Sequence, residues 1–448
     1  MRTRSLALLV ALATLLAGCG TPGGDSGDNT EQAEESKQNS AKVDVAKAGD
    51  VTLTIWDQEV RGGQAAQIKR LNAAFLAQYP NVKINRVAKS FTDLQTTLKL
   101  AVSSNKPPDI VQANQGRTIM GQLVKGGLLK PMDAYADAYG WNERWSETLL
   151  DLNRFNAEGT EFGSGNLYGV SQMGEIVGVF YNRAKVKTVP KTFGEFEQML
   201  AKAKQAGETP IAFGNLDKFG GIHEFQTVQN QFVGKDPTRN FVFAKNGQTF
   251  DTPGNREAAA KLVDWADKGY FTKDFNGTGY DPAWQQFAKG KGPFTIAGTW
   301  ITFDALKALG NKLGFFLMPG REAGGEPISL GGESIPWAIT SKSKHADVAA
   351  AYIDFITNAK AADALVETDN LPAMEATKQP TAPVNKEIFA AWKQLNDADG
   401  LTPYMDYATP TFFDDFSGAV QRLLGGKLTP EAFTKAVQGD YAKFTDEL

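Results

Sequence analysis

The apolar and polar positions near the start of the globular chain follow two periods. Val51, Leu53 and Ile55 alternate with threonines, which is the period of a half-buried strand. The next apolar residues have helical spacing, and Pro80 is expected to end that helix. A strand over 82–87, a helix over 91–102 and a short buried strand over 109–111 are predicted next. This order predicts an α/β fold with a mainly parallel sheet that helices cover.

A second α/β unit is predicted from about residue 168 onward. Val177, Val179 and Tyr181 alternate as in a strand. Thr192 and Glu195 have the spacing of a capping box, so a helix is expected to begin there. Further elements are predicted as a strand over 211–213 and as helices over 258–265, 348–356 and 433–437.

The N-terminal segment has the pattern of an export signal. Arg2 and Arg4 precede an apolar run over 6–17, and this run is too short to cross a bilayer core of about 30 Å as a helix. Leu16-Ala17-Gly18-Cys19 resembles the lipobox of bacterial lipoproteins. The resemblance implies a signal peptide over 1–18, cleavage before Cys19 and a lipid thioether on its sulfur. An ordinary secretory signal that ends near a cysteine is the alternative.

The segment over residues 19–50 is expected to be a flexible tether. It is poor in large apolar side chains and rich in Gly, Asp, Ser, Glu, Gln and Asn, so it has little surface to bury. Together with the lipobox, it predicts a protein that is anchored by lipid to the extracellular face of a bacterial cell membrane.

Composition excludes several kinds of chemistry. Cys19 is the only cysteine of the 448 residues and there are two histidines, so no internal disulfide can form and a zinc centre of His and Cys is nearly excluded. A formal net charge of −4 gives no reason to expect nucleic acid. Neither a nucleophile elbow nor a phosphate-binding loop occurs, and no cofactor or metal is expected. Paired carboxylates could still serve a glycosidase.

Several short motifs follow one another in a fixed order over residues 50–448. They are Leu53–Trp56, Lys106–Val111, Gly126–Leu129, Leu167–Val170, Phe180–Arg183, Phe287–Gly292, Ile296–Trp300, Phe316–Gly320, Gly331–Ser334 and Leu371–Ala373. In this order they resemble the substrate-binding lipoproteins of carbohydrate ABC transporters, extracellular solute-binding protein family 1. One departure is Phe294, where the family usually has Met, and this is expected to affect packing alone.

The resemblance implies an α/β fold of the type II periplasmic-binding-protein kind, with two lobes, hinge strands and a ligand cleft between the lobes. Lobe 1 is expected to contain residues 51–170 and 328–375, and lobe 2 residues 175–320 and 376–448. The implied partners are a carbohydrate, the permease subunits of an ABC transporter and the membrane through the anchor. The protein is expected to be a monomer.

A sugar site needs aromatic rings for the apolar C–H face and polar side chains for the hydroxyl rim. The resemblance assigns ring stacking to Trp300 and hydroxyl binding to Glu175. A core tryptophan and a hinge carboxylate that faces water are the structural alternatives. The candidate ligand-binding residues are Asp57, Glu59, Asn114, Gln115, Arg117, Gln172, Glu175, His223, Trp300, Glu333, Phe413 and Asp414.

These observations lead to one functional hypothesis and two alternatives. The hypothesis is a lipid-anchored receptor that captures a sugar, specifically an oligosaccharide, by hinge closure and delivers it to an ABC importer without changing it. One alternative is a cell-surface glycoside hydrolase that acts on the same sugars. The other is a binding protein for a different solute, such as a polyamine or a metal.

Overall fold

The structure is a computed structural model that describes residues 42–245 and 247–447, and these lie within one compact unit. The predicted signal peptide and the lipid-bearing Cys19 lie outside the described residues. Part of the predicted tether is described and is packed: Val45 is buried in a short 3-10 helix, η1 (Val45–Lys47). Asn81 Nδ2 donates hydrogen bonds to the carbonyl oxygens of Val45 and Gly49. The folded part therefore begins before Val51.

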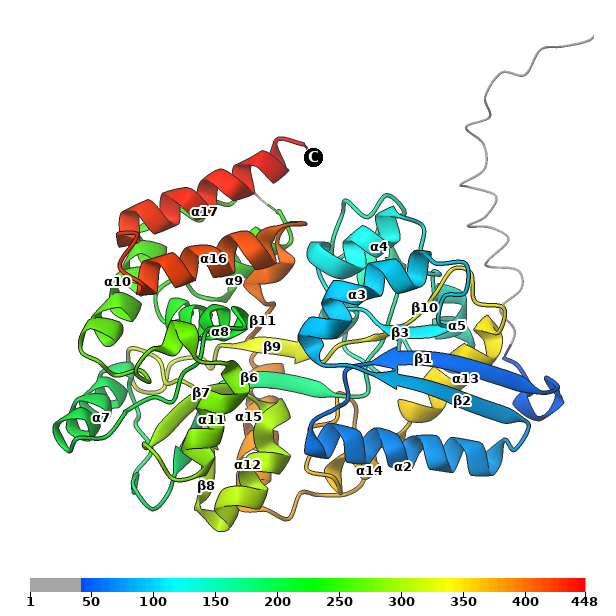
Figure 1. Cartoon of the computed structure of the whole chain (residues 1–448), viewed down its shortest axis with the longest axis horizontal. Coiled ribbons are helices and arrows are strands. Elements are labelled where there is room, and N and C mark those ends of the chain that lie inside the picture. Colours follow the sequence, from blue (N-terminus) through cyan, green and yellow to red (C-terminus); the bar gives the residue numbers. More distant parts are fainter. Residues whose placement is uncertain (1–41, 246, 448) are drawn as a thin grey trace, which may run out of the picture. The chain divides into compact units, whose positions relative to one another are not determined.

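The first sheet has four strands in the order β10-β3-β1-β2 (Figure 1). The strands β1 (Val51–Asp57), β2 (Val82–Ala88) and β3 (Ile110–Gln112) are parallel, as the alternation of strands and helices predicts. The strand β10 (Trp337–Ile339) joins β3 in the antiparallel direction from more than two hundred residues further along the chain. The carboxyl ends of β1 and β3 therefore meet at one edge of this sheet.

Helices cover the first sheet. In α2 (Gly62–Gln78), Ile68, Leu71 and Phe75 form the buried face. Tyr79 is the C-cap, so the helix ends just before Pro80, as predicted. The Phe75 ring packs edge-on against Tyr352 at a centroid distance of 5.3 Å. The other elements of this half are α3 (Phe91–Ser103), the π-helical turn η2 (Arg117–Gly121), α4 (Gln122–Lys125), α5 (Asp133–Tyr139), α6 (Glu147–Asp151), the hairpin β4 (Arg154–Phe155) and β5 (Asn166–Leu167), α13 (Ala346–Ile356) and α14 (Ala359–Val366).

The second sheet is built around one long strand, β6 (Gly174–Asn182). The first residues of β6 pair with β9 (Ser329–Glu333), and the later ones pair with β7 (Phe294–Gly298) and β8 (Leu313–Phe316), all antiparallel. The strand β11 (Leu401–Thr402) lies parallel to β9 at the edge. The prediction of a strand over 211–213 is wrong. Of these residues, Ile211 alone forms β-bridges, and its two bridges, to Phe271 and Phe294, are isolated.

The start of α7 (Phe193–Gln205) bears out half of the predicted capping box. Thr192 Oγ1 accepts from the Glu195 N–H at 3.1 Å, and the Glu195 carboxylate accepts from the N–H of Lys191 instead of Thr192. The other helical elements of this half are α8 (Phe219–Gln229), α9 (Lys235–Val242), α10 (Pro253–Asp267), η3 (Phe275–Gly277), α11 (Tyr280–Ala288), η4 (Thr299–Ile301), α12 (Thr302–Leu309), η5 (Gly310–Lys312), α15 (Pro383–Asp397), η6 (Met405–Tyr407), α16 (Phe412–Leu424) and α17 (Pro430–Thr445).

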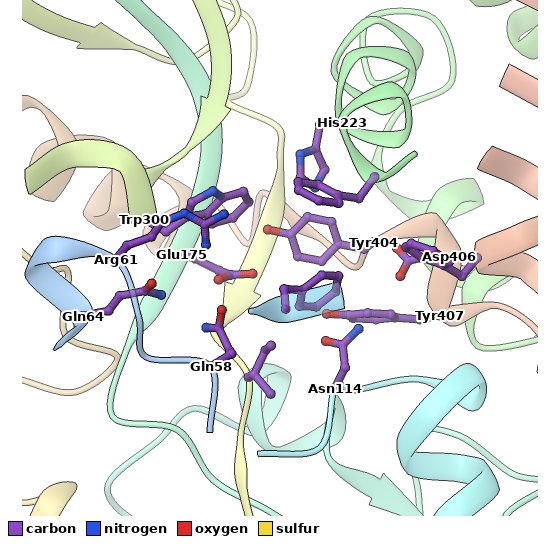
Figure 2. A pocket seen from close by; sticks show the side chains of 14 residues that line it. Gln58, Arg61, Gln64, Asn114, Glu175, His223, Trp300, Tyr404, Asp406 and Tyr407 are labelled. Atoms are coloured by element: carbon purple, nitrogen blue, oxygen red, sulfur yellow. The ribbon is translucent and has the colours of Figure 1, made fainter. Parts of the chain in front are cut away.

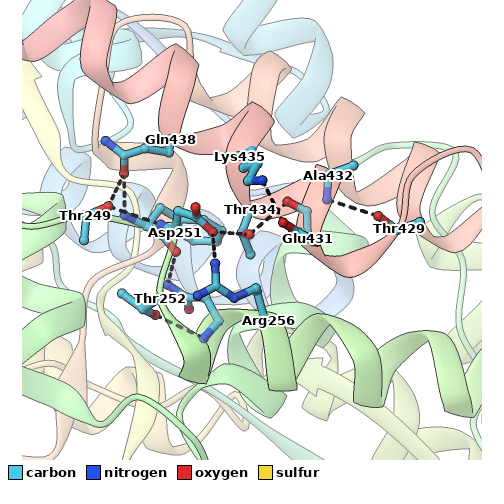
Figure 3. A network of polar contacts seen from close by, with 12 residues as sticks. Thr249, Asp251, Thr252, Arg256, Thr429, Glu431, Ala432, Thr434, Lys435 and Gln438 are labelled. Atoms are coloured by element: carbon cyan, nitrogen blue, oxygen red, sulfur yellow. Dashed lines mark hydrogen bonds and ion pairs between the residues drawn. The ribbon is translucent and has the colours of Figure 1, made fainter.

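The last helix is held to the segment before α10 by a polar network (Figure 3). Asp251 accepts from Arg256 at 2.5 Å and from the Thr434 hydroxyl at 2.6 Å. Gln438 Oε1 accepts from the Phe250 N–H at 2.6 Å. Thr429 is the N-cap of α17 and Pro430 its first residue. None of the helices in the described part of the chain has the length and apolar character that a membrane crossing requires.

Candidate functional site

A cavity of about 70 Å³ lies between elements of the first-sheet half and elements of the second-sheet half (Figure 2). Aromatic rings and polar side chains line it together. The lining residues are Gln58, Arg61, Gln64, Phe91, Asn114, Glu175, Phe219, His223, Trp300, Ile335, Tyr404, Asp406, Tyr407 and Phe413.

The first-sheet half contributes the loops that follow β1 and β3. Gln58 comes directly after β1, Asn114 follows β3, and Arg61 and Gln64 lie at the start of α2. These side chains converge because parallel strands end at the same edge of a sheet, which is where ligands bind in open α/β sheets. Figure 2 shows the four side chains on two sides of the cavity.

A buried polar network lies behind Gln58. Arg86 donates two hydrogen bonds of 2.6 Å to the Asp57 carboxylate and one of 2.7 Å to the Glu59 carbonyl oxygen. Gln112 Nε2 donates to the Glu59 carboxylate at 2.6 Å, and Gln112 Oε1 accepts from the Gln58 N–H at 2.8 Å. Asp57 and Glu59 therefore do not line the cavity. They hold the loop whose middle residue, Gln58, does.

Burial sets the protonation of Glu59. Desolvation raises the pKa of its carboxyl to about 7, the hydrogen bond from Gln112 opposes the rise, and the nearby Asp57 charge adds to it.

The second-sheet half contributes Trp300 and the first turns of α8. Trp300 lies in η4, directly after β7, and its indole folds back over Gly298, where any Cβ atom would overlap the ring. This contact explains the glycine of the Gly-x-Trp motif. The His223 ring lies 5.4 Å from Trp300 and 5.5 Å from Tyr404 between centroids. Burial lowers the pKa of His223 to about 3, so its imidazole is neutral at ordinary pH.

Residues 404–407, here called the pocket wall, form the side of the cavity to the right in Figure 2. Tyr404, Asp406 and Tyr407 line the cavity from this segment. Burial raises the pKa of Asp406 to about 7. The Tyr407 hydroxyl donates to Gln115 Oε1 at 3.2 Å.

The Glu175 side chain lies at the centre of the group of side chains that line the cavity (Figure 2). Glu175 belongs to the part of β6 that pairs with β9. Desolvation raises the pKa of Glu175 to about 7, the hydroxyls of Tyr404 and Ser334 offset part of the rise, and the Glu59 charge adds to it. In Figure 2 the Tyr404 hydroxyl points toward this carboxyl.

Three of the lining side chains contain a buried polar atom without a hydrogen-bond partner among the described residues. They are Arg61 Nε, Gln64 Oε1 and His223 Nδ1. Buried polar groups in folded proteins are nearly always paired, because an unpaired one costs about 1–3 kcal/mol. The cavity is therefore equipped for a ligand that both donates and accepts hydrogen bonds.

The structure places five of the predicted residues on the cavity: Asn114, Glu175, His223, Trp300 and Phe413. Asp57 and Glu59 lie behind it. Gln115 and Arg117 bind main-chain oxygens. Gln172 accepts from Trp337 Nε1, and the buried Glu333 accepts from Asn153 Nδ2 at 2.6 Å. Asp414 is exposed and pairs with Lys218 at 2.6 Å.

The lining residues that the sequence did not identify fall into three groups. Gln58 lies between the predicted residues Asp57 and Glu59, and Arg61 and Gln64 follow them, so strand alternation alone could have pointed to Gln58. The pocket wall had no local signal, because it follows β11, a strand of two residues. The remaining residues of this kind are Phe91, Phe219 and Ile335.

Comparison with known proteins defines the class. The profile of the family described as bacterial extracellular solute-binding protein matches residues 61–363, more than half of the chain. The chain belongs to this family.

Individual relatives agree with this assignment. The chain is 24% identical over 365 residues to the multiple sugar-binding protein of Streptococcus mutans, which covers 78% of this chain and 83% of that protein. It is also 24% identical over 362 residues to the maltodextrin-binding protein MdxE of Bacillus subtilis, with 79% and 80% covered. A solved chitin oligosaccharide binding protein superposes with a TM-score of 0.77 at 23% identity, over 89% of this chain and 99% of that chain. The predicted two-lobe α/β fold is thereby confirmed.

Proposed function

We propose that the chain is the sugar receptor of an ABC importer and that the cavity around Glu175 and Trp300 is its sugar site. The observation that carries this proposal is the set of three unpartnered polar atoms among aromatic rings. Sugar hydroxyls would pair with the polar atoms, and the C–H face of a sugar ring would lie on an aromatic ring such as Trp300. The named sugar ligands of the relatives support the same ligand class.

Capture by hinge closure is the mechanism that we infer. Lobe 1 would comprise residues 51–170 and 328–375, and lobe 2 residues 175–320 and 376–448. Contacts between the halves beside the cavity support it. Arg61 pairs with Asp281 at 3.1 Å, and the Gly62 N–H donates to Asp304 at 3.1 Å. Because β9 is bonded into the second sheet, we place one crossing between the lobes at β9 itself.

The test is a thermal-shift screen followed by calorimetry with maltotriose, raffinose, triacetylchitotriose and a polyamine, spermidine. One of the sugars is expected to raise Tm in a dose-dependent manner, because a ligand that binds the folded state alone stabilises it. A response to spermidine without a response to any sugar would contradict the proposal. The same mixtures are assayed for new reducing ends, since turnover would indicate the glycoside hydrolase.

Anchoring and delivery have their own tests. We propose that Cys19 bears the lipid and that the receptor works on the outer face of the membrane. The full-length chain, expressed in a bacterium, is expected in the membrane fraction with the mass of a lipid-modified N-terminal peptide, and Cys19→Ser is expected in the soluble fraction. An unmodified Cys19 peptide from the membrane fraction would contradict the anchor without affecting sugar binding.

A further inference from the structure

Arg117 was expected to contact ligand, but its contacts show a different arrangement. It is buried in the turn after β3, and its four hydrogen bonds to described residues all go to main-chain carbonyl oxygens. Two of these oxygens belong to Val242 and Phe243, at 2.7 and 3.3 Å, and a third to Ala408, at 2.9 Å. Val242 ends α9, Phe243 is its C-cap and Ala408 is the C-cap of η6.

Arg117 therefore caps two helical segments of the other half. The last carbonyl groups of a helix have no partner within the helix, and the helix dipole makes that end favourable for a cation. A guanidinium presents several N–H groups in one plane, so a single side chain can serve both ends at once. Its guanidinium carbon also lies over the Phe444 ring of α17, 4.9 Å from the ring centroid. Burial lowers the pKa of Arg117 to about 10, which leaves it charged at ordinary pH.

The neighbours of Arg117 contact the same segment. We call residues 115–118 the docking turn. Gln115 accepts from the Tyr407 hydroxyl, and Thr118 Oγ1 lies 2.9 Å from the carbonyl oxygens of both Asp406 and Thr409. Gly116 has a φ of 76°, and a Cβ atom there would overlap Tyr407. Each of the four residues therefore contacts the pocket wall or the two residues after it.

We propose that the docking turn positions the pocket wall across the boundary between the two halves, with Arg117 as the main positioning residue. The pocket wall places Tyr404, Asp406 and Tyr407 on the cavity. Separation of the halves would break every bond from Arg117 to α9 and η6, so this side of the cavity is complete only when the halves meet. The role of the pocket wall in binding rests on the proposed function. The positioning of the wall by Arg117 can be tested without any sugar.

The variants are Arg117→Met, which removes the guanidinium, Arg117→Lys, which keeps the charge, and the milder Thr118→Val. Arg144→Met is the matched control. Arg144 is a partly buried arginine that bonds Asp354 and Thr357 away from the cavity.

Hydrogen–deuterium exchange of the sugar-free protein is the first measurement. The amides of Tyr407 and Ala408 are bonded within η6, and we expect them to exchange at least tenfold faster in both Arg117 variants and to remain as in the wild type in Arg144→Met. The Met405 amide is held by Gln226 of α8 and should change least. Unchanged exchange in peptides over 404–409 of Arg117→Met, or an equal change in Arg144→Met, would overturn the proposal. If Arg117→Met does not fold, Arg117→Lys and Thr118→Val decide by the same criterion.

Calorimetry with the sugar that the wild type binds is the second measurement. Affinity is expected to fall about tenfold in Arg117→Lys and to stay constant in Arg144→Met, although both substitutions lower Tm. Equal affinities in the two variants would contradict a positioning role. If no sugar of the panel binds the wild type, that result counts against the proposed function, and the exchange measurement still decides the role of Arg117.

Discussion

Two buried polar regions next to the cavity, the network behind Gln58 and the groups on and around α8, differ in how completely they are paired. Behind Gln58, the side chains of Asp57, Arg86, Glu59 and Gln112 bond one another in a closed network. On and around α8, several buried polar atoms have no partner among the described residues. They include His223 Nδ1, both carboxyl oxygens of Glu224, Thr227 Oγ1 and Tyr280 Oη.

The difference in pairing indicates that the two regions have different roles. A fully bonded network is rigid and keeps its loop in one position with or without a ligand. Unpaired groups are costly in the empty protein and become favourable when a ligand pairs with them. We therefore expect the network behind Gln58 to determine stability and the unpaired groups around the cavity to determine ligand affinity; these groups include Arg61 Nε and Gln64 Oε1 as well as His223 Nδ1.

The largest effect is expected where the closed network is broken. Asp57→Ala leaves the partly exposed Arg86 without its carboxylate, and since breaking a fully buried ion pair from one side costs about 3–5 kcal/mol, we expect a loss of about 3 kcal/mol here. Denaturant unfolding should show this loss in the free energy of unfolding. Asp397→Ala, which removes an exposed pair with Lys393, is the control and should change it by less than about 1 kcal/mol. Equal losses would contradict a special role for the Asp57 network.

The next effect concerns pH. Because the pKa of Glu175 is raised from 4.5 to about 7, the folded protein keeps this proton at a pH where the unfolded chain has lost it. Its contribution to stability is therefore complete below about pH 4.5 and is lost as the pH rises to about 7, and it amounts to at most about 3 kcal/mol. Glu59 and Asp406 act with the same sign.

Glu175→Gln should flatten this dependence, because an amide cannot ionise. The wild type should lose stability from pH 5 to pH 8 as Glu175 ionises, and the variant should lose less. The free energies of unfolding of both proteins are measured by denaturant unfolding at the two pH values. Glu431→Gln, at an exposed position in α17, is the control and should follow the wild type at both values. A Glu175→Gln curve parallel to that of the wild type would show that Glu175 ionises normally.

The smallest effect is expected for ring stacking on Trp300, next to His223 of α8. Trp300→Ala should weaken binding of the sugar identified in the panel up to about tenfold, since a stacked ring contributes roughly 0.5–1.5 kcal/mol. Trp56→Ala is the control: Trp56 is a partly buried tryptophan of β1 under Lys89, and it does not line the cavity. Calorimetry should show normal affinity for the control. Unchanged affinity in Trp300→Ala would mean that this tryptophan serves packing alone.

Local elements could be predicted because their signals are local. The series β1, α2, β2, α3 and β3 follows from the spacing of apolar residues and from Pro80, all within about sixty residues. The N-caps Thr192 and Thr429 were predictable for the same reason, since a cap acts within one turn. The isolated bridges of Ile211 were not, because pairing depends on the distant partners Phe271 and Phe294.

The sequence by itself determined the α/β class, the strand ends where polar residues gather, and the motifs that carry the family resemblance. Only the tertiary structure decided which of those residues face the cavity. Alternation along the chain places Gln58 on one side and Asp57 and Glu59 on the other, but packing selects the side that stays open. Tyr404 and Tyr407 reach the cavity because Arg117, almost three hundred residues earlier, bonds Ala408. Contacts over such separations follow from how whole elements pack, and local patterns do not encode them.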